Sequence, residues 1–476
     1  MLDWAWFLAE IFMKKSRIEK DTLGTIQIPA HAWYGAQTAR AIANFSVSGR
    51  AADETLIRAF LRIKKAAAEA NRRCGVLDQS RTKSITRAID QILHLPPDRW
   101  KELFPVDIYQ AGAGTSQNMN INEVIANFAN HLAGKPKGSN SPVHPNDHVN
   151  RSQSTNDTFP AAMRLALLEA SAPLFQELQK LGKTFARKAR GWHKIPKSAR
   201  THLQDAVPMR AGQELSGYAM SIEKCADWLQ EGRRNLLVLG ISGSAAGTGL
   251  TVPAGYGTLM IRSLRAQTGE PVSLSDNLFY SMQSQAPVLL YSSMLRLCAV
   301  EITRICNDLR LLASGPLTGL GELLLPAVQP GSSIMPGKVN PSVLEMCNQA
   351  FFSVIGLDQT SMLACQAGQL ELNVMMPIMA HSLIDATHIA SRSLGILRTH
   401  AIEGMRPNTG RMLRYFESTP QIATVLSPKL GYEITAKLVQ EALAEGISIL
   451  ELVRRHQLVG EKELRELTRL ENLAGR

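Results

Sequence analysis

The chain has 476 residues, of which 45% are hydrophobic and 20% charged, as is typical of a globular protein with large buried cores. Its formal net charge of +11 is dispersed, with no basic run of five or more residues, which argues against nucleic-acid binding and suits attraction of small anionic substrates. The six cysteines include no CxxC pair, so neither a zinc site nor a disulfide framework is indicated, and buried thiols in a reducing cytosol fit best.

The first segment, residues 1–16, is interpreted as an N-terminal extension. Its apolar stretch from Trp4 to Met13 contains Glu10 and is far shorter than the roughly 20 residues that span a bilayer. Its charges lie on the wrong side for a signal peptide, and no small-residue cleavage site follows. We therefore expect no stable membrane anchor, and either a packed or disordered extension or a true start at Met13.

Helical periodicity dominates the remainder. The best strand signal is "GTIQIP", Gly24–Pro29. Apolar residues at helical spacing predict long helices over about 161–190, 209–238, 285–313 and 342–402, the last of them broken. Such helices pack as a bundle. The stretch "VLLYSSMLRLCAVEI" is apolar on more than one face, which favours contacts between subunits.

Polar segments rich in Gly, Ser and Asn interrupt these helices and suggest three parts. We expect an N-terminal domain over residues 17–154, a central helical bundle over 155–410 and a smaller helical C-terminal domain over 411–476.

The polar segments also carry an inventory of hydrogen-bonding groups. They supply hydroxyls and amides at Thr115, Ser116, Ser154, Thr155, Asn156 and Thr201, an imidazole at His202 and an ammonium at Lys338. Each segment alone is explained equally by turns and helix N-caps. Together they suit a small dicarboxylate, and no HExxH, Walker or GxGxxG pattern offers a metal or nucleotide site.

One loop is far more specific. "GSSIMPGKVNP", residues 331–341, resembles the signature loop of the aspartase/fumarase superfamily. "GAGTSQNMNINEV", "HVNRSQSTND", "RTHLQDAVP", "SGPLTGLGE" and "AGQLELNV" are similar to its other segments, in the expected order. The resemblance implies a mainly α, three-domain fold with a central long-helix bundle. It also implies a homotetramer with a twenty-helix core, in which each active site gathers residues from three subunits.

The resemblance also assigns roles. Ser332 matches a general base on a mobile lid, His202 a histidine near the leaving group, and Lys338 a carboxylate-binding cation that works with Asn340. These make Ser332, His202 and Lys338 the expected catalytic residues. The residues expected to bind substrate are Thr115, Ser116, Ser154, Thr155, Asn156, Thr201, Ser333, Asn340 and Glu345.

Two of these assignments have simple alternatives. Glu345 matches an acid often paired with the site, but an ordinary helix glutamate explains it equally well. "HPND" resembles a secondary carboxylate site described for fumarases, which would use His144, Asn146 and Asp147, but a turn also explains those residues.

Two subfamilies compete for the activity. "STND", "DAVPM" and "AGQLELNV" resemble aspartate ammonia-lyases, whereas "HPNDHVN" and "NDTFP" resemble class II fumarases. Thr251 and Met376 depart from residues usual in the family. We expect an ammonia-lyase that forms fumarate from L-aspartate, with a fumarate hydratase and a non-catalytic structural oligomer as alternatives.

The remaining expectations follow from that reading. We expect a small dicarboxylate substrate, a cytoplasmic location, and neither a cofactor nor a metal site, while activation by a divalent metal is not readable from the sequence.

Overall fold

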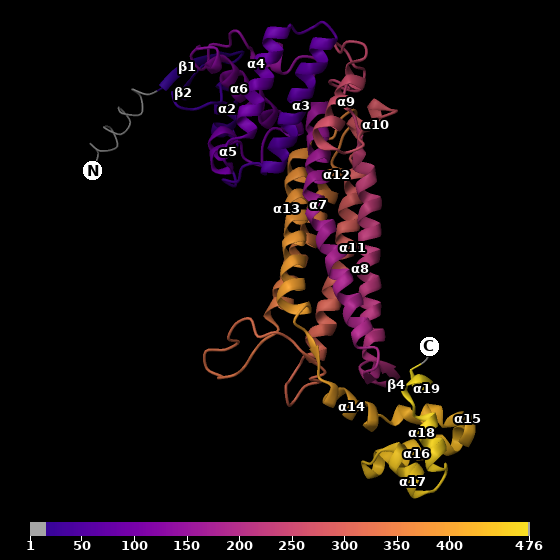
Figure 1. Ribbon diagram of the computed structural model, residues 1–476. Helices are drawn as coiled ribbons and strands as arrows, with labels where there is room; N and C mark the ends of the chain where they lie inside the picture. Colours follow the sequence, from indigo (N-terminus) through magenta and orange to yellow (C-terminus); the bar gives the residue numbers. More distant parts are fainter. Residues whose placement is uncertain (1–15, 475–476) are drawn as a thin grey trace. The chain divides into compact units, whose positions relative to one another are not determined.

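The computed structural model describes residues 16–474, so the predicted extension falls almost wholly outside the described residues. The chain divides into two compact units, and Figure 1 labels many of their helices and strands. Unit 1 consists of the residues up to Pro173, Trp228–Arg296 and Ser353–Ile389. Unit 2 consists of Leu174–Asp227, Leu297–Phe352 and the residues from Ala390 onward. The predicted three-domain boundaries stay a prediction.

The predicted long helices are confirmed. They are α7 (Thr155–Gly191), α8 (Ala211–Arg234), α11 (Ala286–Leu312), α12 (Ser342–Gln366) and α13 (Met376–Ile396), and each contributes residues to both units. The predicted break within 342–402 lies between Gln366 and Met376, and a π-turn over Leu397–Ile402 ends α13.

Buried polar contacts join these helices within each unit. In unit 1, Asp358 of α12 accepts a hydrogen bond from the Ser292 hydroxyl of α11 at 2.6 Å. It also forms an ion pair with Arg296 of α11, at 3.1 Å. In unit 2, the Tyr218 hydroxyl of α8 donates to Asp308 of α11 at 3.2 Å, and the Tyr218 ring meets that of Phe185 on α7 edge to face. Such polar contacts determine which helices pack against each other more strictly than apolar packing does, because a buried polar group needs a hydrogen-bonding partner.

Helix α11 is long and apolar enough, by composition, to cross a membrane, and no other helix within residues 16–474 passes that test. Its polar side chains are instead used inside the bundle, since Ser292 and Arg296 both meet Asp358. Much of its apolar surface is uncovered in the single chain, with Val300 48% exposed.

Shorter helices complete both units. Unit 1 contains α2 (Ala36–Asn44), α3 (Glu54–Arg73), α4 (Gln79–Leu93), α5 (Pro97–Leu103), α6 (Thr115–Leu132), α9 (Tyr256–Thr268) and α10 (Leu278–Gln283). The C-terminal end of unit 2 contains α14 (Thr409–Ser418), α15 (Ser427–Leu430), α16 (Tyr432–Glu445), α17 (Ile449–Arg455), α18 (Glu461–Leu467) and α19 (Leu470–Leu473). Helices α16–α19 share an apolar core that includes Leu438, Leu452 and Leu464.

Strands are short and come in pairs. The predicted strand Gly24–Pro29 is confirmed as β2, which pairs antiparallel with β1 (Ser16–Asp21) in unit 1. A second hairpin, β3 (Pro196–Thr201) with β4 (Gln204–Arg210), lies in unit 2 and was not predicted. Two-residue pairs complete the set: β5 (Val238–Leu239) with β6 (Ser273–Leu274), and β7 (Leu323–Leu324) with β8 (Arg406–Pro407).

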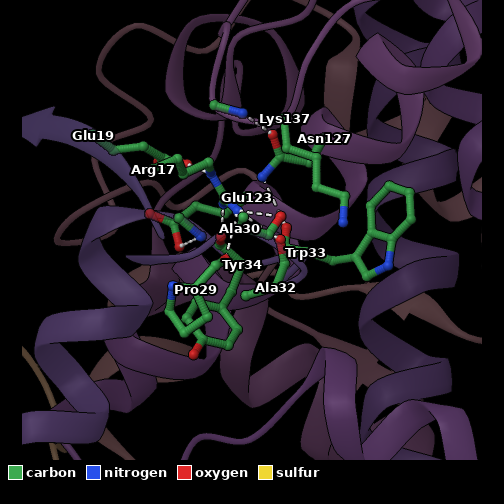
Figure 2. A network of polar contacts seen from close by, with 12 residues as sticks. Arg17, Glu19, Pro29, Ala30, Ala32, Trp33, Tyr34, Glu123, Asn127 and Lys137 are labelled. Atoms are coloured by element: carbon green, nitrogen blue, oxygen red, sulfur yellow. Dashed lines mark hydrogen bonds and ion pairs between the residues drawn. The ribbon is translucent and has the colours of Figure 1, made fainter. Parts of the chain in front are cut away.

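A polar network fastens the β1–β2 hairpin to its surroundings (Figure 2). The guanidinium of Arg17 donates to the carbonyl oxygens of Pro29 at 3.0 Å, Ala32 at 2.8 Å and Tyr34 at 2.6 Å. One arginine thus donates to three carbonyl groups at the end of β2 and just beyond it, and the Pro29 carbonyl also accepts from the N–H of Ala32 at 3.0 Å.

Glu123 of α6 accepts hydrogen bonds from donors at the start of α2, whereas Arg17 donates to carbonyl groups (Figure 2). Its carboxylate accepts hydrogen bonds from the backbone N–H groups of Gly35 at 2.8 Å and Gln37 at 2.9 Å, and from the Thr38 hydroxyl at 2.6 Å. Burial raises the pKa of Glu123, while these donors favour its charged form. The amino end of α2 is thereby held on α6.

Four of the six cysteines are buried, as expected from the sequence. Cys225, Cys298, Cys306 and Cys347 are buried, Cys74 and Cys365 are half-buried, and all six are free thiols.

The amino end of α6 depends on a glycine. Gly114 precedes the helix with φ +83°, in the left-handed region, and a Cβ there would overlap the ring of Phe159 on α7. The absence of a side chain therefore lets the first turns of α6 and α7 approach each other.

Gly114→Ala should lower the free energy of unfolding by roughly 2–4 kcal/mol, because overlap with Phe159 adds to left-handed strain. Gly134→Ala is the matched control, since Gly134 has φ +72° but open space around the position of a Cβ. It should lose only about 1 kcal/mol. Denaturant unfolding of both variants measures the difference, and equal losses would show that the contact with Phe159 is unimportant.

Candidate active site

The expected substrate-binding residues of unit 1 lie at the first turns of α6 and α7. Thr115 begins α6 and is exposed, Ser116 beside it is buried, and Thr155 begins α7. The two turns are joined by a hydrogen bond from Asn118 Nδ2 to Thr155 Oγ1 at 3.0 Å. Two hydroxyl-bearing segments far apart in sequence are therefore neighbours.

The "STND" segment forms the helix cap that its composition also predicts. Ser154 Oγ accepts from the backbone N–H of Asn156 at 3.2 Å, and the Asp157 carboxylate accepts from the N–H of Ser154 at 3.0 Å. This is a reciprocal capping arrangement. Asp157 also accepts from the N–H of Ser244 at 3.1 Å, and Asn156 Nδ2 donates to the Ala245 carbonyl at 2.8 Å. The cap therefore also fixes the glycine-rich segment after β5.

Lys64 of α3 lies behind these turns, and its side chain is fully buried. Its ammonium donates to Asn118 Oδ1 at 2.7 Å, Asn150 Oδ1 at 3.0 Å and Gln153 Oε1 at 3.0 Å. Burial lowers the pKa of Lys64 to about 7, with Asp157 as the opposing charge, and burial raises the pKa of Asp157 to about 7. Three acceptors within 3.0 Å use all three N–H bonds of an ammonium, so we describe Lys64 as protonated.

The "AGQLELNV" segment lies against the start of α6. The backbone N–H of Ala113 donates to the Val374 carbonyl at 2.8 Å, and a Cβ at Gly112 would crowd the Val374 side chain. Asn373 is fully buried and donates to the carbonyls of Ala364 and Cys365 at 3.1 and 3.0 Å. Two motifs that the sequence placed in one site are thus in contact.

Thr201 and His202 lie at the tip of the β3–β4 hairpin in unit 2 and are exposed. His202 has φ +56° and Leu203 φ +61°, a left-handed pair that ordinarily favours glycine or asparagine. Such strain persists only where surrounding contacts hold it, and it concentrates at functional sites.

A buried ionic cluster supports this hairpin. Lys197 Nζ lies 2.8 Å from Glu214 and 3.2 Å from Glu322, and Arg200 lies 3.0 Å from the other oxygen of Glu322. Glu322 and Lys197 are almost without solvent exposure. Because an unpaired charge there would be very unfavourable, β3 is firmly held where it leads to Thr201.

The loop of residues 331–341 closes on itself. The N–H of Gly331 donates to the Lys338 carbonyl at 2.9 Å, and Asn340 Nδ2 donates to the Gly331 carbonyl at 3.0 Å. Gly337 has φ +79°. Inside the loop, Ser332 Oγ accepts from the backbone N–H groups of Ile334 at 3.3 Å and Met335 at 3.2 Å.

Lys338 in this loop and Glu345 just after it differ in whether they form ion pairs. Lys338 is exposed, and no carboxylate of residues 16–474 pairs with it; Ser333 is also exposed. Glu345, in the first turn of α12, lies 3.7 Å from Arg310, an ordinary helix-to-helix ion pair. That contact agrees with the simple alternative for Glu345, and its role in substrate binding stays a prediction.

The "HPND" segment forms a π-turn. His144 Nδ1 accepts from the N–H of Asp147 at 3.1 Å, while Asn146 and Asp147 are exposed. His144 and Asn146 line a cavity of about 380 Å³ that is also lined by Glu19, Asp21 and Glu123. These acidic side chains would repel a dicarboxylate. The turn therefore accounts for this segment better, and the secondary site stays a prediction.

The expected site residues divide between the two units. Thr115, Ser116, Ser154, Thr155 and Asn156 belong to unit 1, whereas Thr201, His202, Ser332, Ser333, Lys338, Asn340 and Glu345 belong to unit 2. In the part of the chain that is described, no hydrogen bond or ion pair joins the His202 hairpin to the Ser332 loop. Likewise, residues 16–474 contain no group of three or more His, Cys, Asp or Glu side chains arranged to hold a metal.

Sequence reasoning missed Lys64, Asn118, Asp157, Lys197 and Glu322. For Lys64 a signal existed, because Ile57, Leu61 and Ala68 share its helical stripe and are all buried. A lysine on such a stripe needs buried acceptors.

Comparison with known proteins identifies the family. A family model described as "Lyase" matches residues 24–356, and one described as "Fumarase C C-terminus" matches residues 422–475. The chain belongs to the aspartase/fumarase superfamily. The resemblance of its signature loop and the predicted mainly helical fold are thereby confirmed, and the protein is a lyase by family.

Individual superfamily members match along almost the whole chain. An aspartate ammonia-lyase of Pseudomonas aeruginosa is 42% identical over 461 residues, covering 96% of this chain and 97% of its own. A class II fumarate hydratase of Thermosynechococcus vestitus is 40% identical, covering 97% and 98%. A fumarate lyase:delta crystallin structure from Brucella melitensis, bound to cobalt, has a TM-score of 0.92 at 39% identity, covering 96% and 99%.

Proposed function

We propose that this lyase is an aspartate ammonia-lyase, which reversibly eliminates ammonia from L-aspartate to give fumarate. The observation that carries the proposal is the environment of Ser332. Its Oγ accepts two backbone N–H groups within a loop that also holds the unpaired ammonium of Lys338. That arrangement suits a serine acting as a general base rather than as a surface hydroxyl.

Free serine is too weak an acid to be a base at neutral pH, so its alkoxide needs stabilisation. Hydrogen bonds from the N–H groups of Ile334 and Met335 favour the charged form of the oxygen. Exclusion of water by a closed loop would strengthen both of them. The alkoxide then removes a proton from the carbon beside one carboxylate of the substrate.

The resulting intermediate is an aci-carboxylate, which carries an additional negative charge on its carboxylate oxygens. Lys338 is the cation of the loop and is free to meet that charge. Preorganised donors at such a position are worth roughly 10²–10³ in rate each. Collapse of the intermediate expels ammonia from the neighbouring carbon, and His202 is the proposed partner of the leaving group.

The hydroxyl and amide groups of Thr115, Thr155 and Asn156 are the proposed ligands of the substrate. They have the donors that carboxylate oxygens need, and Thr201 and neutral His202 offer acceptors for an ammonium. An amine and a hydroxyl leaving group differ by one charge and in donor count, so one pocket does not serve both equally well.

The choice of aspartate over malate rests on sequence. "STND" with Thr155 and "AGQLELNV" are aspartase-like, and the contact of Ala113 with Val374 joins the latter to the start of α6. Relatives named for either activity match at about equal identity, so class II fumarate hydratase is the second candidate. No cofactor enters the proposal, and a cytoplasmic location is part of it.

A homotetramer with shared active sites is proposed for the same reasons. Helices α11 and α12 leave large apolar side chains uncovered in the single chain, including Val300 at 48% and Phe352 at 57% exposure. On α11 the exposed residues Leu290, Leu297, Val300 and Leu311 recur at helical spacing, and an apolar stripe of this kind marks an interface between subunits.

The purified protein should release fumarate from L-aspartate faster than from L-malate, because a pocket that pairs with substrate N–H groups rejects an analogue that leaves them unpaired. Fumarate absorbance with each substrate at matched concentration measures the preference. Faster turnover of malate would reassign the protein as a class II fumarase and keep Ser332 as base, whereas no turnover of either would favour a structural oligomer.

Ser332→Ala should fold and assemble but lose about 10²–10⁴-fold in kcat, the usual effect of removing a general base. Ser333→Ala is the control, because it keeps the Ser332 hydroxyl and the N–H groups that it accepts; its loss should be much smaller. Near-normal turnover by Ser332→Ala would refute the assignment of the base.

A further inference from the structure

The buried ammonium of Lys64 fixes the orientation of three amide side chains. An ammonium has donors and no acceptor, so the atoms that face it from Asn118, Asn150 and Gln153 must be amide oxygens. Each amide must then direct its NH2 group elsewhere. Gln153 Nε2 donates to the Val149 carbonyl at 2.9 Å, and Asn150 Nδ2 to the Gln153 carbonyl at 3.3 Å. Lys64 therefore organises the segment that leads into α7.

The orientation of the Asn118 amide affects Thr155, a residue of the proposed site. With its oxygen held by Lys64 at 2.7 Å, its Nδ2 points to Thr155 Oγ1 at 3.0 Å and to Asn150 Oδ1 at 3.3 Å. Thr155 thus accepts a hydrogen bond from within the protein. Among residues 16–474, no acceptor takes the hydroxyl proton of Thr155. That proton is left to donate to a ligand.

We propose that Lys64 and Asn118 are positioning residues that set the hydrogen-bond polarity of Thr155, so that its hydroxyl donates to a carboxylate of the substrate. This inference rests on the proposed function, which places Thr155 at the substrate. In this chain of hydrogen bonds, the Lys64 ammonium donates to the Asn118 amide oxygen, and the Asn118 NH2 group donates to the Thr155 hydroxyl oxygen. The Thr155 hydroxyl proton is then donated to the substrate carboxylate.

A purely structural role for Asn118 predicts something different. In that case its replacement would weaken folding or the packing of α6 on α7, and activity would fall whether or not Thr155 has a hydroxyl. The proposed role acts only through Thr155 Oγ1, so the effect of changing Asn118 should vanish when that oxygen is absent.

Asn118→Asp is the decisive variant. An aspartate keeps the shape of the side chain and its contact with Lys64, which holds the carboxylate ionised, but it has no N–H to donate. Thr155 should then turn its proton inward to the new carboxylate. We expect kcat/KM to fall about 10- to 100-fold, the effect of losing a hydrogen bond to a charged group, mostly through KM.

The same change in a Thr155→Val background should alter kcat/KM by less than about twofold, because no hydroxyl remains to be turned. Asn150→Asp is the matched control. It places the same charge on the same lysine, but the donor that it removes points to the Gln153 carbonyl rather than to Thr155. Its loss should be much smaller than that of Asn118→Asp.

The experiment measures kcat/KM with L-aspartate and L-malate, succinate binding by calorimetry, and thermal stability for wild type, the single variants and the double variant. Equal losses from Asn118→Asp with and without Thr155, no loss in the wild-type background, or an equal loss in Asn150→Asp would overturn the proposal. If Asn118→Asp does not fold, Asn118→Ala replaces it, with the same required dependence on Thr155.

Succinate separates this proposal from the proposed function, because it is a dicarboxylate with no leaving group. Wild-type protein that binds succinate but turns over neither substrate would overturn the proposed reaction, while the affinities of the variants would still decide the role of Asn118. A wild type that neither binds succinate nor turns over L-aspartate or L-malate would overturn both.

Discussion

The buried ammonium of Lys64 is the interaction on which the polar segments of unit 1 depend. A charge removed from water is tolerated only when donors and acceptors compensate it fully, and here three amide oxygens and the nearby carboxylate of Asp157 do so. Those amides belong to α6 and to the segment before α7, so satisfying one lysine fixes both. The hydroxyls of the proposed site in unit 1 are thus supported by a buried group that lies behind them.

Unit 2 also contains a buried charge with compensating partners, but here the central charge is a carboxylate rather than an ammonium. Glu322 is the fully buried member, and Lys197 and Arg200 of β3 compensate it. Arg200 also lies over the ring of Tyr415 on α14, with its guanidinium carbon 5.1 Å from the ring centroid. Through these contacts the strand that leads to Thr201 is anchored on both sides, although its tip is exposed. In both units the supporting charges are buried. The proposed site residues of unit 2 lie at or near the surface, whereas Ser116 and Thr155 of unit 1 are buried.

Sequence predicted what depends on local pattern. The long helices, the strand at Gly24–Pro29 and the break before Met376 all follow from periodicity and turn residues. The β3–β4 hairpin did not, because a strand of Pro, Lys, Ser and Arg has little strand propensity, and its turn uses His and Leu where glycine or asparagine is usual. The burial of Lys64 could be predicted from its helical stripe, but the partners in these supports could not: Lys64 and Gln153 are 89 residues apart, and Arg200 and Glu322 are 122 apart. Such pairs are created by the fold and leave no local pattern.

The central claim is the proposal that each site is completed by several chains. It rests on the apolar side chains that α11 and α12 leave uncovered, and on the lack, within residues 16–474, of any hydrogen bond or ion pair between the His202 hairpin and the Ser332 loop. The most direct test mixes Ser332→Ala chains with His202→Asn chains, reassembles the oligomers and measures fumarate formation. Asparagine is suitable because it tolerates the left-handed backbone at His202. If the base and the imidazole of one site come from different chains, mixed oligomers contain some intact sites and recover activity that neither variant has alone. Mixed oligomers that stay as inactive as the parents, or a wild-type enzyme that is active as a monomer in light scattering, would contradict the account.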